Sequence, residues 1–235
     1  MKILNKHPSA IVSCTSWNKR IKYSVGLINN FINQKLLPHK IYLNLSTDEF
    51  PNKNWDIPDE LNKLERKYKN LFIINWVKEN TMAYKKLLPV VEYYSQYPDR
   101  IILTADDDCV YTNDYVEYMI NLANMFPHNY ITPGTFNPYL HGYAAAYHTD
   151  WFKSGILWQI NPEECEKIPC SDHWIMRCMG DIGVTNKVIP EIANKVKQLD
   201  IPHKLTDKYK DLLNTNTLKN RLEETFSKYY NSRSM

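Results

Sequence analysis

The stretch Ile101-Ile102-Leu103-Thr104-Ala105-Asp106-Asp107-Asp108 (IILTADDD) joins a short apolar run to three consecutive aspartates. A short apolar run that changes abruptly to charged residues is typical of a buried strand that ends at the edge of a sheet. Adjacent carboxylates repel one another, so they are costly to hold together unless a cation lies nearby. This stretch therefore predicts a buried strand with an acidic site at its carboxyl end.

Similar apolar runs precede this stretch and alternate with helical patterns. Four strands are expected, at residues 10–14, 41–45, 71–77 and 101–104. Three helices are expected around them, at residues 21–32, 84–94 (with Pro89 in its first turns) and 115–126. Alternating strands and helices predict an α/β fold with a mainly parallel sheet. Ligands of such sheets bind beyond the carboxyl ends of the strands, so functional residues are expected after residues 14, 45, 77 and 104.

The composition is that of an ordinary globular protein. The chain has 235 residues, of which 43% are hydrophobic, and its 29 Lys and Arg against 26 Asp and Glu give a net charge of +3. This composition excludes disordered, collagen-like and small disulfide-stapled proteins. A dedicated nucleic-acid-binding domain usually has a stronger basic excess. One domain, or one domain with a small appendage, is expected.

The cysteines and the amino terminus indicate a cytoplasmic protein. The first residues are polar and basic, and no apolar stretch is long enough for a signal peptide or a membrane span. Five cysteines, an odd number unevenly spread, fit reduced thiols better than a disulfide framework. Cys165, Cys170, His173 and Cys178 lack the tight spacing of a zinc knuckle, which favours buried thiols over a zinc site.

The three aspartates have the chemistry of a site for a hard divalent cation. Mn²⁺ and Mg²⁺ prefer oxygen ligands and bridge phosphates, so either ion would offset the repulsion between Asp106 and Asp108. The alternative is an acidic turn that stays solvated. The position at a strand end of an α/β sheet favours the metal.

Several short motifs together resemble one enzyme family. The segments are VSCTSW at residues 12–17 followed by Arg20-Ile21, YKKL at residues 84–87, and TADDD at residues 104–108. In this order they resemble GT-A glycosyltransferases, and more narrowly the bacterial family-2-like enzymes that build surface polysaccharides and lipooligosaccharides. The resemblance covers about residues 11–174. It implies a Rossmann-like sheet flanked by helices, and transfer of a sugar from a nucleotide-diphosphate sugar, most simply a UDP-sugar, to a saccharide or lipid-linked oligosaccharide.

The resemblance also implies roles for individual residues. Asp106 would approach the ribose or the metal, Asp108 would coordinate the metal, and the middle residue Asp107 would be structural or donor-binding. Donor-binding roles are expected for Ser13, Thr15, Arg20, Lys85 and Lys86. The lysines would neutralise the diphosphate, although a solvated helix face explains each of them equally well. Some members complete the metal shell with a histidine near the carboxyl terminus, here His203, for which an exposed loop residue is the alternative.

A general base is expected well after the acidic strand end. Family members place an acidic pair before a helix, and Ser171-Asp172 occupies that position here, so the first carboxylate is missing. Asp172 is the expected base, which would imply inversion at the anomeric carbon. Its alternative role is a helix N-cap. Asp150 is the second candidate, at the end of a small-residue segment from Gly142 that would form either a sugar-binding floor or a tightly packed strand.

Charge divides the chain into two unequal parts. Residues 1–184 contain 19 basic and 20 acidic residues, whereas residues 185–235 contain 10 and 6. We expect a catalytic domain at 1–184, with a nucleotide-sugar half (1–110) and an acceptor-side half (111–184), and a basic, largely helical extension at 185–235. The extension ends in a helical stripe of Leu218, Leu222, Phe226 and Tyr229. This stripe would either contact the anionic inner membrane surface or close over the core.

Two other functions fit the same pattern. A sugar-phosphate nucleotidyltransferase shares a related sheet and an acidic metal site, but it needs a glycine-rich phosphate loop, and residues 13–20 contain no glycine. A carbohydrate-binding protein that keeps the fold without catalysis is the non-enzymatic alternative.

Overall fold

The computed structural model describes residues 10–97, 99–136, 139–140, 142–154, 160–202 and 215–231. The strands are β1 Ala10–Thr15, β2 Lys40–Ser46, β3 Phe72–Val77, β4 Ile101–Asp106, β5 Cys109–Tyr111, β6 Asn129–Thr132, β7 Thr135–Phe136, β8 Tyr139–Leu140, β9 Ala144–His148, β10 Thr185–Val188 and β11 Val196–Gln198. The α-helices are α1 Ser24–Ile32, α2 Asp59–Lys67, α3 Leu88–Tyr94, α4 Tyr115–Met125, α5 Pro162–Lys167, α6 Ser171–Asp181 and α8 Thr215–Asn231. Short 3₁₀ helices are η1 Ile21–Tyr23, η2 Lys53–Trp55, η3 Met82–Lys86, η4 Thr149–Ser154 and η6 Pro190–Lys195.

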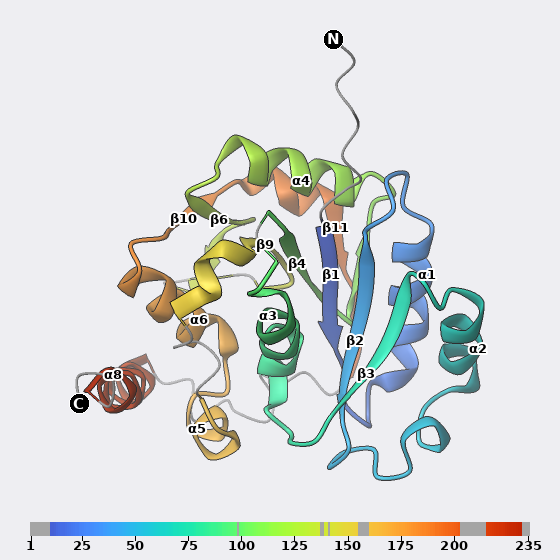
Figure 1. Cartoon of the computed structure of the whole chain (residues 1–235), viewed down its shortest axis with the longest axis horizontal. Helices are drawn as coiled ribbons and strands as arrows, with labels where there is room; N and C mark the ends of the chain where they lie inside the picture. Colours follow the sequence, from blue (N-terminus) through green and yellow to red (C-terminus); the bar gives the residue numbers. More distant parts are fainter. Residues whose placement is uncertain are drawn as a thin grey trace.

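Seven strands form one central sheet in the order β10-β6-β9-β4-β1-β2-β3 (Figure 1). β1 lies between β4 and β2 and is parallel to both, and β2 is parallel to β3. β9 is antiparallel to β4 and to β6. The sheet is therefore mostly parallel, as expected, and the carboxyl ends of β1 to β4 lie at the same edge.

Alternate residues of the strands build two cores, one on each face of the sheet. Val12 of β1 and Leu103 of β4 join helices α1, α2 and α4 on one face. Their neighbours Ile11 and Ile102 join α3, α5, α6 and α8 on the other face. Figure 1 shows these helices on both sides of the sheet. Because both faces are covered, the central strands read as continuous apolar runs, which explains why they stood out in the sequence.

The expected elements agree with the observed ones, with small differences at their ends. The helix expected at 84–94 is divided into η3 and α3, and Pro89 lies in the first turn of α3 as anticipated. The first expected helix begins as η1 and continues as α1.

The basic carboxyl-terminal region contributes strands to the body of the protein. β10 is parallel to β6 at one edge of the central sheet, and β11 is antiparallel to β5. Leu218, Leu222 and Phe226 of α8 are buried in the core that also contains α6. The stripe of α8 thus packs on the protein, while the domain boundary at 184/185 stays a prediction.

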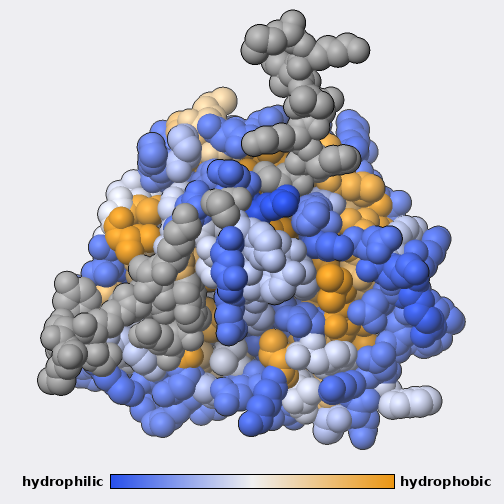
Figure 2. All heavy atoms as spheres, in the orientation of Figure 1, coloured by the Kyte–Doolittle hydropathy of each residue, from blue (hydrophilic) through white to orange (hydrophobic). Residues whose placement is uncertain are grey.

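Figure 2 shows that hydrophilic residues dominate the face seen in Figure 1, with hydrophobic residues gathered in small patches. Within the described ranges, no helix is both long and apolar enough to cross a bilayer.

Candidate active site

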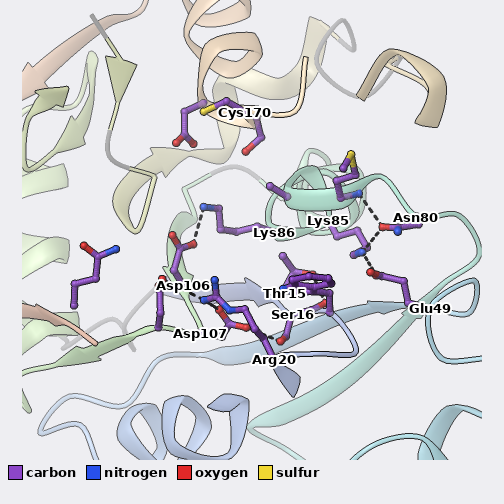
Figure 3. A pocket seen from close by; sticks show the side chains of 17 residues that line it. Thr15, Ser16, Arg20, Glu49, Asn80, Lys85, Lys86, Asp106, Asp107 and Cys170 are labelled. Atoms are coloured by element: carbon purple, nitrogen blue, oxygen red, sulfur yellow. Dashed lines mark hydrogen bonds and ion pairs between the residues drawn. The ribbon is translucent and has the colours of Figure 1, made fainter. Parts of the chain in front are cut away.

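A pocket of about 330 Å³ lies at the carboxyl edge of the central strands. Its floor comes from the segment after β1, the end of β4 and η3, and the first turn of α6 lies across from them (Figure 3). The lining residues are Thr15, Ser16, Trp17, Arg20, Glu49, Asn80, Met82, Ala83, Lys85, Lys86, Asp106, Asp107, Asp108, Cys170, Ser171, Asp172 and Gln198. The fold thus joins the motifs around residues 15, 85, 107 and 172 in one cavity.

Lys86 and Asp106 point toward each other in the middle of the pocket (Figure 3). Lys86 Nζ lies 2.8 Å from Asp106 Oδ1 and donates a second hydrogen bond of 3.2 Å to the carbonyl of Gly142. Burial alone would lower the pKa of Lys86, but the carboxylates of Asp106 and Asp172 outweigh it and hold the pKa above its ordinary value. Lys86 is therefore a fixed positive charge between two carboxylates.

Asp107 and Asp108 share Arg20, which comes from the segment that follows β1. The Arg20 guanidinium binds Asp107 and lies 3.2 Å from Asp108 Oδ2, and the Ser16 hydroxyl donates a hydrogen bond of 2.5 Å to Asp107. Burial raises the pKa of Asp107 to about 6, although Arg20 and Ser16 oppose this rise. Asp107 thus anchors Arg20, whereas Asp106, with 36% of its side chain exposed, is the most accessible of the three aspartates.

Lys85 points away from Lys86, toward the ends of β2 and β3 (Figure 3). Its ammonium group binds the Glu49 carboxylate and the Asn80 side-chain oxygen. Burial lowers the pKa of Lys85, and Glu49 counteracts part of this effect. Asn80 also accepts a hydrogen bond of 3.0 Å from the backbone N–H of Met82, whose φ of 54° is left-handed. This cluster fixes the strained turn that begins η3 and forms one wall of the pocket.

Asp172 lies in the first turn of α6, on the side of the pocket opposite the strand ends. One of its oxygens accepts a hydrogen bond of 3.2 Å from the backbone N–H of Gly142. Helix α6 begins after Cys170, which makes no side-chain cap. The negative charge of Asp172 is favoured by the helix N-terminus.

Two of the candidate residues named from the sequence, Ser13 and Asp150, do not line this pocket. Ser13 is buried inside the sheet, where its hydroxyl accepts a hydrogen bond of 3.0 Å from Asn44. Asp150 follows β9, which begins opposite Ala105 and leads away from the pocket. Since its five residues span about 17 Å at about 3.4 Å each, the exposed Asp150 lies toward the opposite edge of the sheet. His203 lies outside the described residues.

Four polar residues of the pocket were not singled out from the sequence as candidates. Ser16 follows β1, Glu49 and Asn80 follow β2 and β3, and Gln198 belongs to β11. The rule that ligands bind beyond the ends of parallel strands indicated the regions of Glu49 and Asn80 without selecting these residues. No local signal pointed to Gln198, because its place depends on the pairing of β11 with β5.

The described ranges contain no group of three or more His, Cys, Asp or Glu side chains arranged to hold a metal ion. The three aspartates do not form such a group, because Asp107 turns toward Arg20 and Ser16. The cluster of Cys165, Cys170, His173 and Cys178 does not form one either. Among the described residues, Asp106 and Asp108 are thus the two carboxylates of the triplet that remain for a metal.

His173, next to Asp172, gives a testable dependence of stability on pH. Burial lowers the pKa of His173 to about 4, against about 6.5 in an unfolded chain. Because the unfolded chain binds a proton at this histidine more tightly than the folded protein does, protonation favours unfolding. The free energy of unfolding is therefore unaffected by His173 above pH 6.5 and decreases as the pH falls toward 4. Between pH 8 and pH 5 the expected loss is about 2 kcal/mol.

Urea unfolding of the wild type and of His173→Gln at pH 8 and pH 5 measures this loss. Gln cannot be protonated, so the variant should lose about 2 kcal/mol less than the wild type between the two pH values. An equal loss in both proteins would show that His173 does not control the acid sensitivity.

No known protein family and no curated protein matches the sequence. Among solved structures, the fold is similar to that of the mannosyltransferase PcManGT from Pyrobaculum calidifontis in complex with GDP-Man and Mn²⁺, with a TM-score of 0.59 and 12% identity over 80% of this chain and 56% of that one. S. aureus TarS in complex with UDP matches with a TM-score of 0.48 and 13% identity over 72% of this chain and 54% of that one. The chain thus spans little more than half the length of these proteins. It has the α/β fold of the mannosyltransferase.

Proposed function

We propose that the chain is a metal-dependent glycosyltransferase that moves a sugar from a nucleoside-diphosphate sugar to a saccharide acceptor. The observation that carries this proposal is the pocket itself. It places Asp106, Asp108, Arg20 and Lys86 at the strand ends and a carboxylate, Asp172, across from them. The fold likeness to a mannosyltransferase in complex with GDP-Man and Mn²⁺ supports the same activity.

The charge of the pocket suits a divalent cation. Its lining includes five carboxylates (Glu49, Asp106, Asp107, Asp108, Asp172) and three basic side chains (Arg20, Lys85, Lys86), a net charge of −2 when all are ionised. A donor diphosphate would add further negative charge, which a bound cation would offset. Mg²⁺ and Mn²⁺ accept one or two carboxylates together with substrate phosphates and water. Asp106 and Asp108 would hold the ion, and the ion would stabilise the charge of the leaving diphosphate.

The basic side chains have different roles in this proposal. Lys86 and Arg20 lie beside the two metal-binding aspartates, so they would offset the negative charge of the diphosphate. Lys85 is held by Glu49 and Asn80, and it would order the wall that receives the nucleoside. Thr15 donates a hydrogen bond of 2.7 Å to the backbone of Asn44, so it would contact the nucleoside mainly through its methyl group.

Asp172 would act as the general base. The acceptor hydroxyl oxygen would attack the anomeric carbon while its proton passes to the Asp172 carboxylate, and the bond from the anomeric carbon to the diphosphate oxygen would break. Attack from the face opposite the leaving group inverts the configuration. A UDP-linked donor and an acceptor of the bacterial surface-glycan type, met at the inner membrane face, complete the proposal on the strength of the sequence resemblance.

A donor screen tests the proposed function. UDP-Glc, UDP-Gal, UDP-GlcNAc, UDP-GalNAc and GDP-Man are incubated with the protein and Mn²⁺, and release of the nucleoside diphosphate is measured with and without EDTA. We expect release from at least one donor and its loss in EDTA. Pyrophosphate release from a nucleoside triphosphate and a sugar phosphate would instead indicate a nucleotidyltransferase. Binding of saccharides without any release would indicate a carbohydrate-binding protein.

A further inference from the structure

Gly142 lies closer to the Asp172 carboxylate than any residue with a side chain could. A Cβ atom built on Gly142 would lie 2.1 Å from Asp172 Oδ1, and the next two atoms it would meet, at 2.7 and 2.8 Å, also belong to this carboxyl group. The φ angle of Gly142 is outside the left-handed region, so space rather than backbone conformation requires glycine here. Contacts under 3.0 Å are avoided by real side chains, so a larger residue must displace Asp172.

The backbone groups of Gly142 connect the two sides of the pocket. Its N–H donates to Asp172 Oδ2 at 3.2 Å. Its carbonyl accepts hydrogen bonds from the Thr104 hydroxyl at 2.8 Å and from Lys86 Nζ at 3.2 Å. Thr104 is a buried residue of β4, and Lys86 in turn binds Asp106 at the end of the same strand. A single residue therefore lies between the carboxylate of α6 and the acidic end of β4.

We propose that Gly142 is a positioning residue, which holds the Asp172 carboxylate at a fixed place relative to the acidic end of β4. Thr104 and Lys86 hold the Gly142 carbonyl, and the Gly142 N–H then sets the place of the Asp172 oxygen. This inference rests on the proposed function, because it states that Gly142 determines the distance between the general base Asp172 and the donor site. Transfer depends steeply on such a distance, since a displacement of about 1 Å costs roughly a hundredfold in rate.

Two variants of Thr104 test the hydrogen bond to the Gly142 carbonyl while the carboxylates of Asp106 and Asp172 stay unchanged. Thr104→Val keeps the shape of the buried side chain but removes the hydroxyl that binds the Gly142 carbonyl, whereas Thr104→Ser keeps the hydroxyl. We expect kcat for transfer to fall about tenfold in Thr104→Val, with KM for the donor within about twofold of the wild type. Thr104→Ser should recover most of the loss. A valine variant with unchanged kcat, or a serine variant as impaired as valine, would overturn the proposal.

A thermal-unfolding cycle tests the close approach independently of activity. Gly142→Ala in the wild-type background should lower the unfolding midpoint by about 3–10 °C because of the collision with Asp172. In the Asp172→Ala background the carboxyl group is gone, so the same change should lower the midpoint by less than about 2 °C. Equal losses in the two backgrounds would show that the contact does not constrain residue 142.

The two tests separate this inference from the proposed function. A wild type that releases no nucleoside diphosphate from any donor refutes the function, and the unfolding cycle still reports whether Gly142 and Asp172 are in contact. A wild type that transfers sugar, beside a Thr104→Val variant with normal kcat, refutes only the positioning role.

Discussion

Asp108→Asn is expected to lower the rate of sugar transfer about a thousandfold while the protein stays folded. The amide keeps the size of the side chain, but it lacks the charge that would bind a divalent cation, whose stabilisation of the diphosphate contributes several kcal/mol. Asp108 also lies 3.2 Å from Arg20, and Arg20 keeps its partner Asp107 in the variant. Initial rates at saturating Mn²⁺ measure the loss, and the thermal midpoint reports the fold.

Asp114→Asn is the matched control. Asp114 precedes α4, binds Lys195 at 2.7 Å and is not among the residues that line the pocket, so its loss should leave the rate within about twofold. Calorimetry adds a direct measurement, since Mn²⁺ should strengthen UDP binding to the wild type and not to Asp108→Asn. The metal role of Asp106 and Asp108 is wrong if Mn²⁺ leaves the UDP affinity of the wild type unchanged.

Asp172→Asn should lower kcat for transfer by about a hundredfold to ten-thousandfold, the usual contribution of a general base. An amide cannot accept the proton of the acceptor hydroxyl, but it can still accept the hydrogen bond of Gly142 N–H. We therefore expect the affinity for UDP and Mn²⁺ to stay within about threefold of the wild type. Rapid-mix single-turnover assays with the donor found in the screen measure the chemical step.

Two controls accompany this variant. Asp181→Asn makes the same chemical change at the other end of α6, where the side chain is exposed. Asp150→Asn changes the second candidate base, which lies toward the opposite edge of the sheet. Both should transfer sugar at nearly the wild-type rate. Near-normal transfer by Asp172→Asn together with a large loss in Asp150→Asn would place the base elsewhere than proposed.

The fold was largely predictable because its central strands are buried on both faces. The apolar run 101–104 and the acidic residues after it share one short segment, so local sequence determines both the strand and its end. The ion pair between Lys86 and Asp106 was not predicted, because the sequence analysis assigned Lys86 only to the donor diphosphate or to a solvated helix face. Burial and charge pattern thus predicted β4 and its acidic end.

The remaining parts of the site depend on contacts between distant segments. Asp107 stands in the same triplet as Asp106 and Asp108, yet it turns toward Arg20, 87 residues away in the sequence. Gly142 was noted as a small residue, but its contact with Asp172 depends on the antiparallel course of β9 and on the docking of α6. Asp150 was a candidate because it is near Gly142 in sequence. Strand β9 lies between the two residues and places Asp150 toward the edge of the sheet opposite the pocket. Sequence proximity misleads where a strand separates two residues.

The neighbouring lysines of η3 have a consequence for how insertions and deletions would act on this protein. A 3₁₀ helix has three residues per turn, so consecutive side chains differ in direction by about 120°. This rotation lets Lys85 reach Glu49 while Lys86 reaches Asp106. Removal of one residue from η3 would rotate every following side chain by a third of a turn, and neither lysine could keep its carboxylate. Natural or engineered length variation should therefore be tolerated in the exposed connection at 51–55, which includes η2, far better than within 82–86.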